Sequence, residues 1–199
     1  MTESTSNILI KERFEDSSTD IDSYIYLNGE LKARDLEFCE CNREHAIALN
    51  KIWHSRLPHA QKSPWQFAFK AHYNGLTYAV ALWNNPCSRM LPKNWIELRR
   101  LAISSDAPKN TASRFLASMT RYFKQHHPEK ERLISYQDTA VHEGTIYKAS
   151  GWEIGYYSKP INRDRTEIKK GTNRLYRKNT NGKTVDKSPK IRWEKSLKN

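Results

Sequence analysis

The chain has 199 residues and carries 34 Lys+Arg against 22 Asp+Glu, a formal net charge of +12. This length corresponds to one medium domain that can bury a core without disulfides or metals. The three cysteines are an odd number and do not suggest a secreted disulfide framework. No apolar run approaches the roughly 20 residues of a membrane helix, and the first residues contain no apolar signal core. We therefore expect a soluble, cytoplasmic protein with no membrane partner.

The positive charge is concentrated at one end of the chain. Residues 159–199 contain 14 Lys+Arg and 4 Asp+Glu, which is +10 of the formal +12. A near-neutral body with a cationic extension indicates a polyanion partner, and a solvated, disordered end is the alternative. Tyr176 and Trp193 lie among these charges and are suited either to stacking on bases or to packing onto the body.

The first half of the chain predicts a strand, a helix and a hairpin. Residues 1–34 are polar, with one candidate edge strand at 24–27. Residues 35–41 alternate as a strand does, and Asn42 then reads as the N-cap of a helix that ends near His54. Two β-rich runs flank Asn74-Gly75, which is a strong hairpin signal.

The second half predicts strands that alternate with helices. Residues 95–103 form a strand, and an amphipathic helix begins near Asn110 and ends before Pro128. A strand at 132–138 precedes a short helix at 144–150, and Gly151 reads as the C-cap glycine before a strand at 152–158. Residues 172–178 are a candidate last strand.

This element order predicts an α/β (α+β) fold, a mixed and mostly antiparallel sheet flanked by helices. We expect a partly flexible N-terminal segment at 1–34, a catalytic domain at 35–158 and a basic C-terminal extension at 159–199. The oligomeric state is not readable from the sequence.

The order of elements resembles the GNAT acyltransferase fold. The resemblance implies that the diphosphate of an acyl-coenzyme A lies on the helix N-terminus after the fourth strand. It also implies that Tyr147, in IYKASGW, is the general acid on the later short helix. The chain has DAPKNTASRF where the usual GNAT sequence has a glycine-rich loop.

A closer resemblance is to the phage Mom family, a GNAT-related branch. It is carried by ELRRLAI, PKNTASRF, ISYQD and GTIYKAS, and by His54 in IWHS, over about residues 40–158. The resemblance implies conversion of the adenine N6 amine in double-stranded DNA to a carbamoylmethyl (acetamido) derivative in the host-cell cytoplasm. It further implies acetyl-CoA as cofactor, an iron requirement, and protection of phage DNA from restriction. Ser55 stands where the family has a tyrosine.

The loop before the second long helix is the expected cofactor site. The first-turn amides of a helix point outward and attract anions. Asn110 is suited to capping this helix, while the hydroxyls of Thr111 and Ser113 and the charges of Lys109 and Arg114 can contact phosphate oxygens. An ordinary capped helix is the alternative.

Four side chains are candidates for catalysis or metal binding. Asp138 ends a strand, where it can accept a proton from an adenine amine or bind a metal, and an Asx turn is the alternative. His54 is a candidate catalytic residue and metal ligand beside Asp138, with His142 as a rival ligand. Tyr147 is the proposed proton donor or orienting hydroxyl, and a half-buried core tyrosine is the alternative.

Three functions fit these observations. The first is a Mom-type DNA-modifying transferase that flips the target adenine out of the duplex. The second is a GNAT N-acetyltransferase that acts on a small amine or a protein lysine. The third is a non-catalytic nucleic-acid-binding protein.

Overall fold

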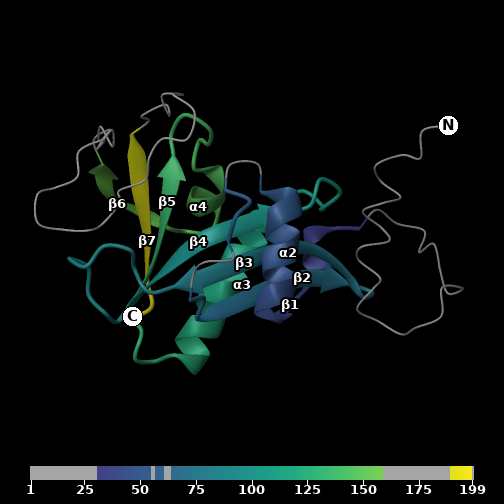
Figure 1. The fold of residues 1–199 in the computed structure, drawn as a ribbon, viewed down its shortest axis with the longest axis horizontal. Coiled ribbons are helices and arrows are strands. Elements are labelled where there is room, and N and C mark those ends of the chain that lie inside the picture. The colour runs from purple at the N-terminus through teal and green to yellow at the C-terminus, as the bar shows by residue number, and fades with distance from the viewer. Residues whose placement is uncertain (1–30, 55–56, 61–63, 159–188, 199) are drawn as a thin grey trace, which may run out of the picture.

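The computed structural model describes residues 31–54, 57–60, 64–158 and 189–198 (Figure 1). Several predicted features lie outside the described residues: the candidate strands at 24–27 and 172–178, most of the basic extension, and Tyr176. In chain order the elements are η1 Ala33–Asp35, β1 Glu37–Glu40, α2 Arg43–Trp53, β2 Phe67–Tyr73, β3 Leu76–Asn84, β4 Trp95–Ile103, α3 Thr111–His126, β5 Arg132–Asp138, α4 Thr145–Ala149, β6 Glu153–Ser158 and β7 Lys190–Ser196.

Local sequence signals account for several element boundaries. The side chain of Asn42 accepts a hydrogen bond from the Glu44 amide at 2.7 Å, which confirms the predicted cap of α2. Asn74 and Gly75 both have positive φ, as the tight turn between β2 and β3 requires. Gly151 has φ +70 after α4, which confirms its place as the glycine that ends that helix.

The sheet has seven strands in the order β1-β2-β3-β4-β5-β7-β6. Every neighbouring pair is antiparallel except β4 and β5, which are parallel. The predicted fold class is therefore confirmed. Strand β7 comes from the segment expected to be a basic extension, and it lies between β5 and β6. The sheet therefore includes residues beyond position 158. The side chain of Trp193, on β7, is buried in the core.

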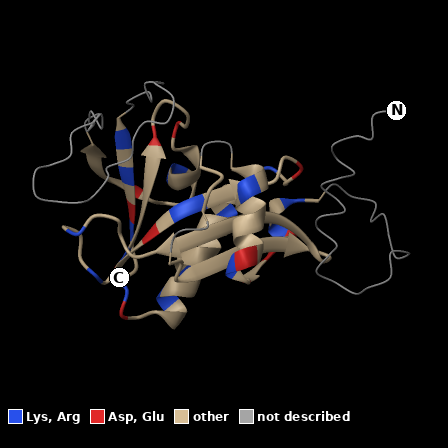
Figure 2. Cartoon of the chain, viewed as in Figure 1, with Lys and Arg blue, Asp and Glu red and all other residues tan. Residues whose placement is uncertain are grey.

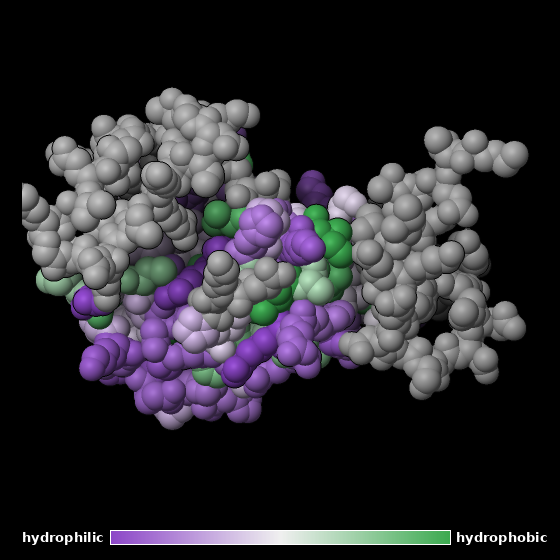
Figure 3. Space-filling model, in the orientation of Figure 1, coloured by the Kyte–Doolittle hydropathy of each residue, from purple (hydrophilic) through white to green (hydrophobic). Residues whose placement is uncertain are grey.

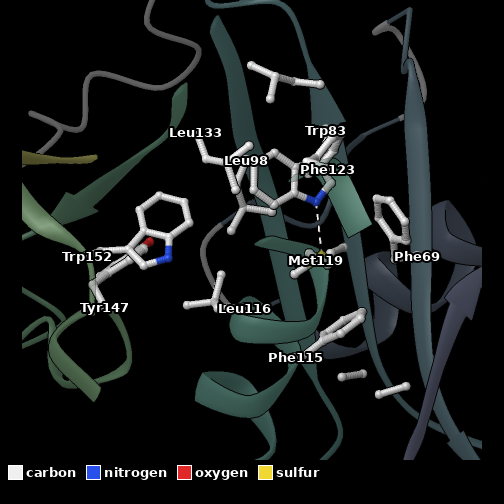
Figure 4. Close-up of a cluster of buried hydrophobic side chains, with 14 of the residues drawn as sticks. Phe69, Trp83, Leu98, Phe115, Leu116, Met119, Phe123, Leu133, Tyr147 and Trp152 are labelled. Atoms are coloured by element: carbon white, nitrogen blue, oxygen red, sulfur yellow. Dashed lines mark hydrogen bonds between the residues drawn. The ribbon is translucent and has the colours of Figure 1, made fainter. Parts of the chain in front are cut away.

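Helices cover both faces of the sheet. Figure 1 shows α2 in front of the sheet and α3 behind it. The α3 side holds the larger core, in which Trp83 donates a hydrogen bond from Nε1 to Met119 Sδ at 3.0 Å (Figure 4). The α2 side holds a second core that includes Leu49 and Leu82. Strand β3 contributes to both cores, so its residues form one continuous buried run.

In the orientation of Figures 2 and 3, the face toward the viewer is mostly hydrophilic, and basic residues recur along one strand, β7. Figure 2 shows Lys and Arg recurring along β7. The face seen in Figure 3 is largely hydrophilic, with apolar residues gathered near its middle. No helix among the described residues is both long enough and apolar enough to cross a bilayer.

Candidate active site

Strands β4 and β5 separate from each other part-way along their length. They pair from Trp95↔Arg132 to Leu98↔Ser135 and no further. Beyond that point β4 continues to Ile103 beside β3, while β5 continues to Asp138 beside β7. Figure 1 shows the ends of the two arrows diverging. Beyond Leu98 and Ser135 the two strands no longer pair with each other, so their facing edges can receive an extended ligand between them.

A β-bulge lies at the same place on β4. Trp83 of β3 is opposite Leu98, and Leu82 is opposite Arg100, so Arg99 is the extra residue. A bulge of this kind bends the strand and redirects the side chains that follow it. The bend helps to turn β4 away from β5, and it directs Arg100 toward the α2 side, where its guanidinium lies 5.9 Å from the Trp65 ring.

A buried hydrogen-bond chain closes the point of divergence on the α3 side. Ser135 Oγ lies 3.1 Å from the Leu98 carbonyl and 2.9 Å from Tyr147 Oη. Because a carbonyl only accepts, the Ser135 proton goes to Leu98, and Tyr147 must donate to Ser135. Burial raises the pKa of Tyr147, partly opposed by the hydrogen bond to Ser135, so the phenol stays protonated at neutral pH.

The surroundings of Tyr147 also make it a core residue. Its side chain is 8% exposed, and its ring stacks on Trp193 at 5.3 Å and lies 5.6 Å from Trp152. Figure 4 shows Tyr147 and Trp152 together at one end of the core cluster. A role as proton donor would require the bond to Ser135 to break first. That role stays a prediction, and a positioning role is the one that this geometry supports directly.

The N-terminus of α3 follows β4 and lies at the diverging end of the sheet. Asn110 occupies the predicted N-cap position, where its carbonyl accepts from the Arg114 amide, but the prediction that its side chain caps the helix is wrong. Asn110 is in the left-handed conformation, φ 70, and its side chain makes no cap hydrogen bond. Thr111 is buried and donates from both its amide and its hydroxyl to the Pro108 carbonyl, so its hydroxyl points into the chain. Ser113 Oγ likewise donates to the Asn110 carbonyl.

Other groups at this helix end remain suited to an anion. Within the part of the chain that the structure describes, the amides of Ala112 and Ser113 have no acceptor. Lys109 and Arg114 are exposed beside them, with one guanidinium nitrogen of Arg114 at 3.5 Å from the Arg34 carbonyl. The expected diphosphate site therefore depends on the amides of Ala112 and Ser113 and on the charges of Lys109 and Arg114. The predicted contacts from the Thr111 and Ser113 hydroxyls would require both side chains to rotate away from their present acceptors.

His54 lies at the end of α2 on the opposite side of the sheet. Its ring is within electrostatic range of Arg100 and His142. Burial, with these two neighbours, lowers the pKa of His54, so the ring is neutral at pH 7. Nδ1 accepts a hydrogen bond from the Leu57 amide at 3.3 Å, which directs the ring proton to Nε2. The predicted rival His142 therefore lies near enough to His54 to influence its pKa.

Asp138 forms the turn that places His142. Its Oδ1 accepts from the Ala140 amide at 3.1 Å, and its carbonyl accepts from the Val141 and His142 amides. The Asx turn considered as the alternative is therefore present. Iron does not fit the described residues, because they contain no group of three or more His, Cys, Asp or Glu side chains able to hold a metal. We assign no chemical step to iron.

Two residues at the point of divergence on the α2 side, Glu97 and Tyr136, were not predicted from the sequence. Glu97 is buried and accepts from the Cys87 amide at 2.7 Å; burial raises the pKa of Glu97. Tyr136 follows Ser135 and is hydrogen-bonded to Arg192. Ser135 and Tyr136 both lie in the ISYQD string, but only the separation of the strands shows that they flank a site.

Several solved structures with a similar fold are acetyltransferases. The ribosomal-protein-S18-alanine N-acetyltransferase from Escherichia coli matches with a TM-score of 0.55 at 12% identity, over 81% of this chain and 94% of that one. A Bacillus subtilis acetyltransferase in complex with CoA matches with a TM-score of 0.55 at 9% identity, over 81% and 98%. A putative phosphinothricin N-acetyltransferase gives 0.56 at 13%, over 82% and 99%. At these identities the likeness establishes a GNAT-like fold.

No curated protein matches the sequence. The model of the Mom protein family matches residues 74–199, which include the bulged strand β4, helix α3, the Ser135–Tyr147 pair and strand β7. This match covers more than half of the chain. The chain therefore belongs to the Mom protein family.

Proposed function

We propose that this protein is a DNA-modifying transferase of the Mom type. Its substrate is adenine in double-stranded DNA, and its product is the N6-carbamoylmethyl (acetamido) derivative, which shields phage DNA from restriction enzymes in the host cytoplasm. The observation that carries the proposal is the family match across residues 74–199, which contain the diverging strands of a GNAT-like fold. Both the family and the fold support a transferase.

The described residues offer the donor a binding path between β4 and β5. The pantetheine arm of an acetyl-CoA-like donor would lie between β4 and β5 where these strands no longer pair with each other, as a short extra strand does. Its diphosphate would bind the free amides of α3 together with Lys109 and Arg114. The Ser135–Tyr147 pair would hold the inner end of that path rigid and dry, because both side chains are buried.

The adenine acceptor would bind on the α2 side of the sheet, opposite the Ser135–Tyr147 pair. His54, Asp138 and Tyr136 belong to the α2 side, where an extruded adenine would meet the donor between the strands. His54 is neutral at pH 7 because its pKa is lowered, and Asp138 carries a carboxylate, so either is suited to accept a proton from the amine.

The proposed product sets a clear requirement on the reaction. An acetyl thioester supplies two carbons and one oxygen, whereas a carbamoylmethyl group also contains an amide nitrogen and is joined through its methylene carbon. Balance therefore requires an ammonia-level nitrogen donor and a two-electron oxidant, with free thiol as the other product. Cells supply both classes of reactant, so the decisive test is made in cells.

The test is mass spectrometry of nucleosides from bacteria that make the wild-type protein. We expect a modified deoxyadenosine with the mass of the carbamoylmethyl derivative, and strong loss of it with Asp138→Ala. Unmodified deoxyadenosine, in cells that contain folded wild-type protein, would refute the proposal.

Coenzyme A binding to the purified protein tests the donor site separately. Loss of a charge-assisted contact costs about 1.5–3 kcal/mol, so Arg114→Ala should weaken binding roughly tenfold or more. Arg121→Ala is the matched control, since Arg121 lies on the same helix two turns away and contacts Ser118. If the two variants bind coenzyme A equally well, the N-terminus of α3 is not part of the coenzyme A site.

The shared fold keeps one other function open to test. The structural neighbours are acetyltransferases, which favours a GNAT N-acetyltransferase as the second candidate. Transfer of label from acetyl-CoA to a small amine or a protein lysine, with unmodified DNA, would select it.

A further inference from the structure

One face of the β5-β7-β6 part of the sheet carries exposed aromatic rings. Residues alternate between faces along a strand, and Ser135 and Trp193 point toward α4. Tyr136 and Arg192 therefore point to the α2 side. Tyr156 is paired with Arg192 and lies on the same side, with the guanidinium 5.4 Å from its ring. Tyr156 is 54% exposed and Tyr136 36% exposed.

Ion pairs with one buried carboxylate hold the guanidinium groups on this face in place. Glu194 is buried, and its carboxylate contacts Arg132 and also Arg192, whose Nη2 lies at 2.7 Å and Nε at 2.8 Å. Gly155 makes this possible, because a Cβ there would lie 1.9 Å from Glu194 Oε1. Both Arg192 nitrogens contact the same oxygen, Glu194 Oε1, and two contacts from one planar group restrict its orientation.

The same two arginines lie over an indole ring. The Arg132 guanidinium is 4.8 Å from the centre of the Trp95 ring, and that of Arg192 is 5.7 Å from it. Arg192 is also hydrogen-bonded to the Tyr136 phenol. We refer to Trp95, Tyr136, Tyr156, Arg132 and Arg192 as the aromatic–arginine face.

The aromatic–arginine face adjoins the candidate active site. Tyr136 directly follows Ser135, the last β5 residue that pairs with β4. Helix α2, the described helix on this side of the sheet, packs on β2, β3 and β4. It makes no substantial contact with β5, β7 or β6, which carry Tyr136, Arg192 and Tyr156. A ligand on this face would therefore end at the point where the two strands diverge.

We propose that the aromatic–arginine face binds unpaired bases of a DNA strand by stacking, next to the adenine that enters the active site. The inference rests on the proposed function. Exposed tyrosine rings are a surface on which bases stack, because every base has a π-face. The guanidinium groups of Arg132 and Arg192 lie against the Trp95 ring and add positive charge beside the tyrosines. Lys190, exposed on the same side of β7, is placed to meet a phosphate.

The chain offers a matched pair of variants for the test. Tyr156 and Tyr157 are neighbours on β6 and are both exposed, at 54% and 63%. Tyr157 is paired with Ile191 and lies on the α4 side, away from the aromatic–arginine face. Both Tyr156→Ala and Tyr157→Ala remove an exposed ring at the surface, so thermal unfolding is expected to show similar stability.

The measurement is the affinity of the full-length protein for a short adenine-rich single strand that contains 2-aminopurine. Removing a stacking partner costs roughly 5- to 150-fold in affinity. We expect Tyr156→Ala and Tyr136→Ala to weaken binding within that range and to reduce 2-aminopurine quenching. Tyr156→Phe, which keeps the ring, should retain binding, and Tyr157→Ala should bind as the wild type does.

The outcomes separate this inference from the proposed function. Equal binding by Tyr156→Ala, Tyr136→Ala and Tyr157→Ala would overturn the stacking face, whether or not cellular DNA is modified. Selective weakening by Tyr156→Ala and Tyr136→Ala would support the face even if wild-type cells contain only unmodified deoxyadenosine. If these variants instead change the oligomeric state in size-exclusion chromatography without changing DNA binding, the face is a protein interface and the inference is wrong.

Discussion

At the residue scale, close packing around α4 explains the glycine that starts it. Gly144 has φ +75, and a Cβ there would lie 2.5 Å from Gln137 Oε1 and 2.6 Å from Trp193 Cζ2. Trp193 donates from Nε1 to the same Gln137 oxygen at 2.7 Å, so neither neighbour moves freely. The family-like string GTIYKAS contains this glycine, but only the packing shows why another residue is excluded.

Gly144→Ala should therefore destabilise the protein strongly. The left-handed backbone costs about 1 kcal/mol for alanine, and overpacking adds about 1–3 kcal/mol. Gly75→Ala is the control, because Gly75 has φ +78 with no atom near the added Cβ. Urea denaturation should show a clearly larger loss for Gly144→Ala. Equal losses of unfolding free energy would mean that Gln137 and Trp193 move to accommodate the added Cβ at little cost.

At the element scale, the start of α3 shows how a correct boundary was predicted for a wrong reason. Sequence reasoning placed the helix start near Asn110 because asparagine is a common cap. The structure uses the other property of asparagine, its tolerance of the left-handed conformation. The local sequence indicates that an asparagine stands at the helix start. Whether it acts through a side-chain hydrogen bond or through a left-handed backbone depends on the backbone conformation.

The two explanations predict opposite results for two substitutions. Asn110→Gly should be as stable as the wild type or slightly more stable, because glycine adopts φ 70 without cost. Asn110→Ser should lose about 1 kcal/mol, although serine is an excellent cap. The check is the thermal midpoint of both variants. A stable serine variant with a weakened glycine variant would restore the capping explanation.

Strand β7 was not predicted, although its sequence alternates. In KIRWEKS the apolar positions Ile191 and Trp193 face the core, while Arg192 and Glu194 face the other side. Five charged or polar residues in seven gave this segment the composition of a solvated tail. The ion pair of Arg192 with Glu194, which lies within one strand, offsets the cost of burying the carboxylate, and it becomes visible only in the fold.

At the scale of the whole molecule, the C-terminal strand completes the sheet. Strand β7 lies between β5 and β6, and Trp193 is 2% exposed beneath Tyr147. Removal of β7 would leave β6 without a partner and would expose the α4 side of the core. The basic composition of the C-terminal region therefore says little about its part in the fold.

Truncation after Pro189 should abolish cooperative unfolding. Truncation after Leu197 is the control, since it keeps β7 and the bond from the Leu197 amide to the Glu131 carbonyl while removing the exposed Lys198. Circular dichroism during heating should show a sharp transition for the longer chain only. A sharp transition in both would show that residues 190–196 are dispensable for folding.

The sequence by itself determined the type and order of most elements, the Asn74-Gly75 turn and the resemblance to the Mom family. These features depend on residues a few positions apart, through periodicity, turn conformation and short motifs. The tertiary structure alone decided where β4 and β5 part, how Tyr147 is bonded to Ser135, and which tyrosines share a face with Arg192. Each of these depends on pairing between strands far apart in the chain, and a shift of one residue in register would reverse the faces.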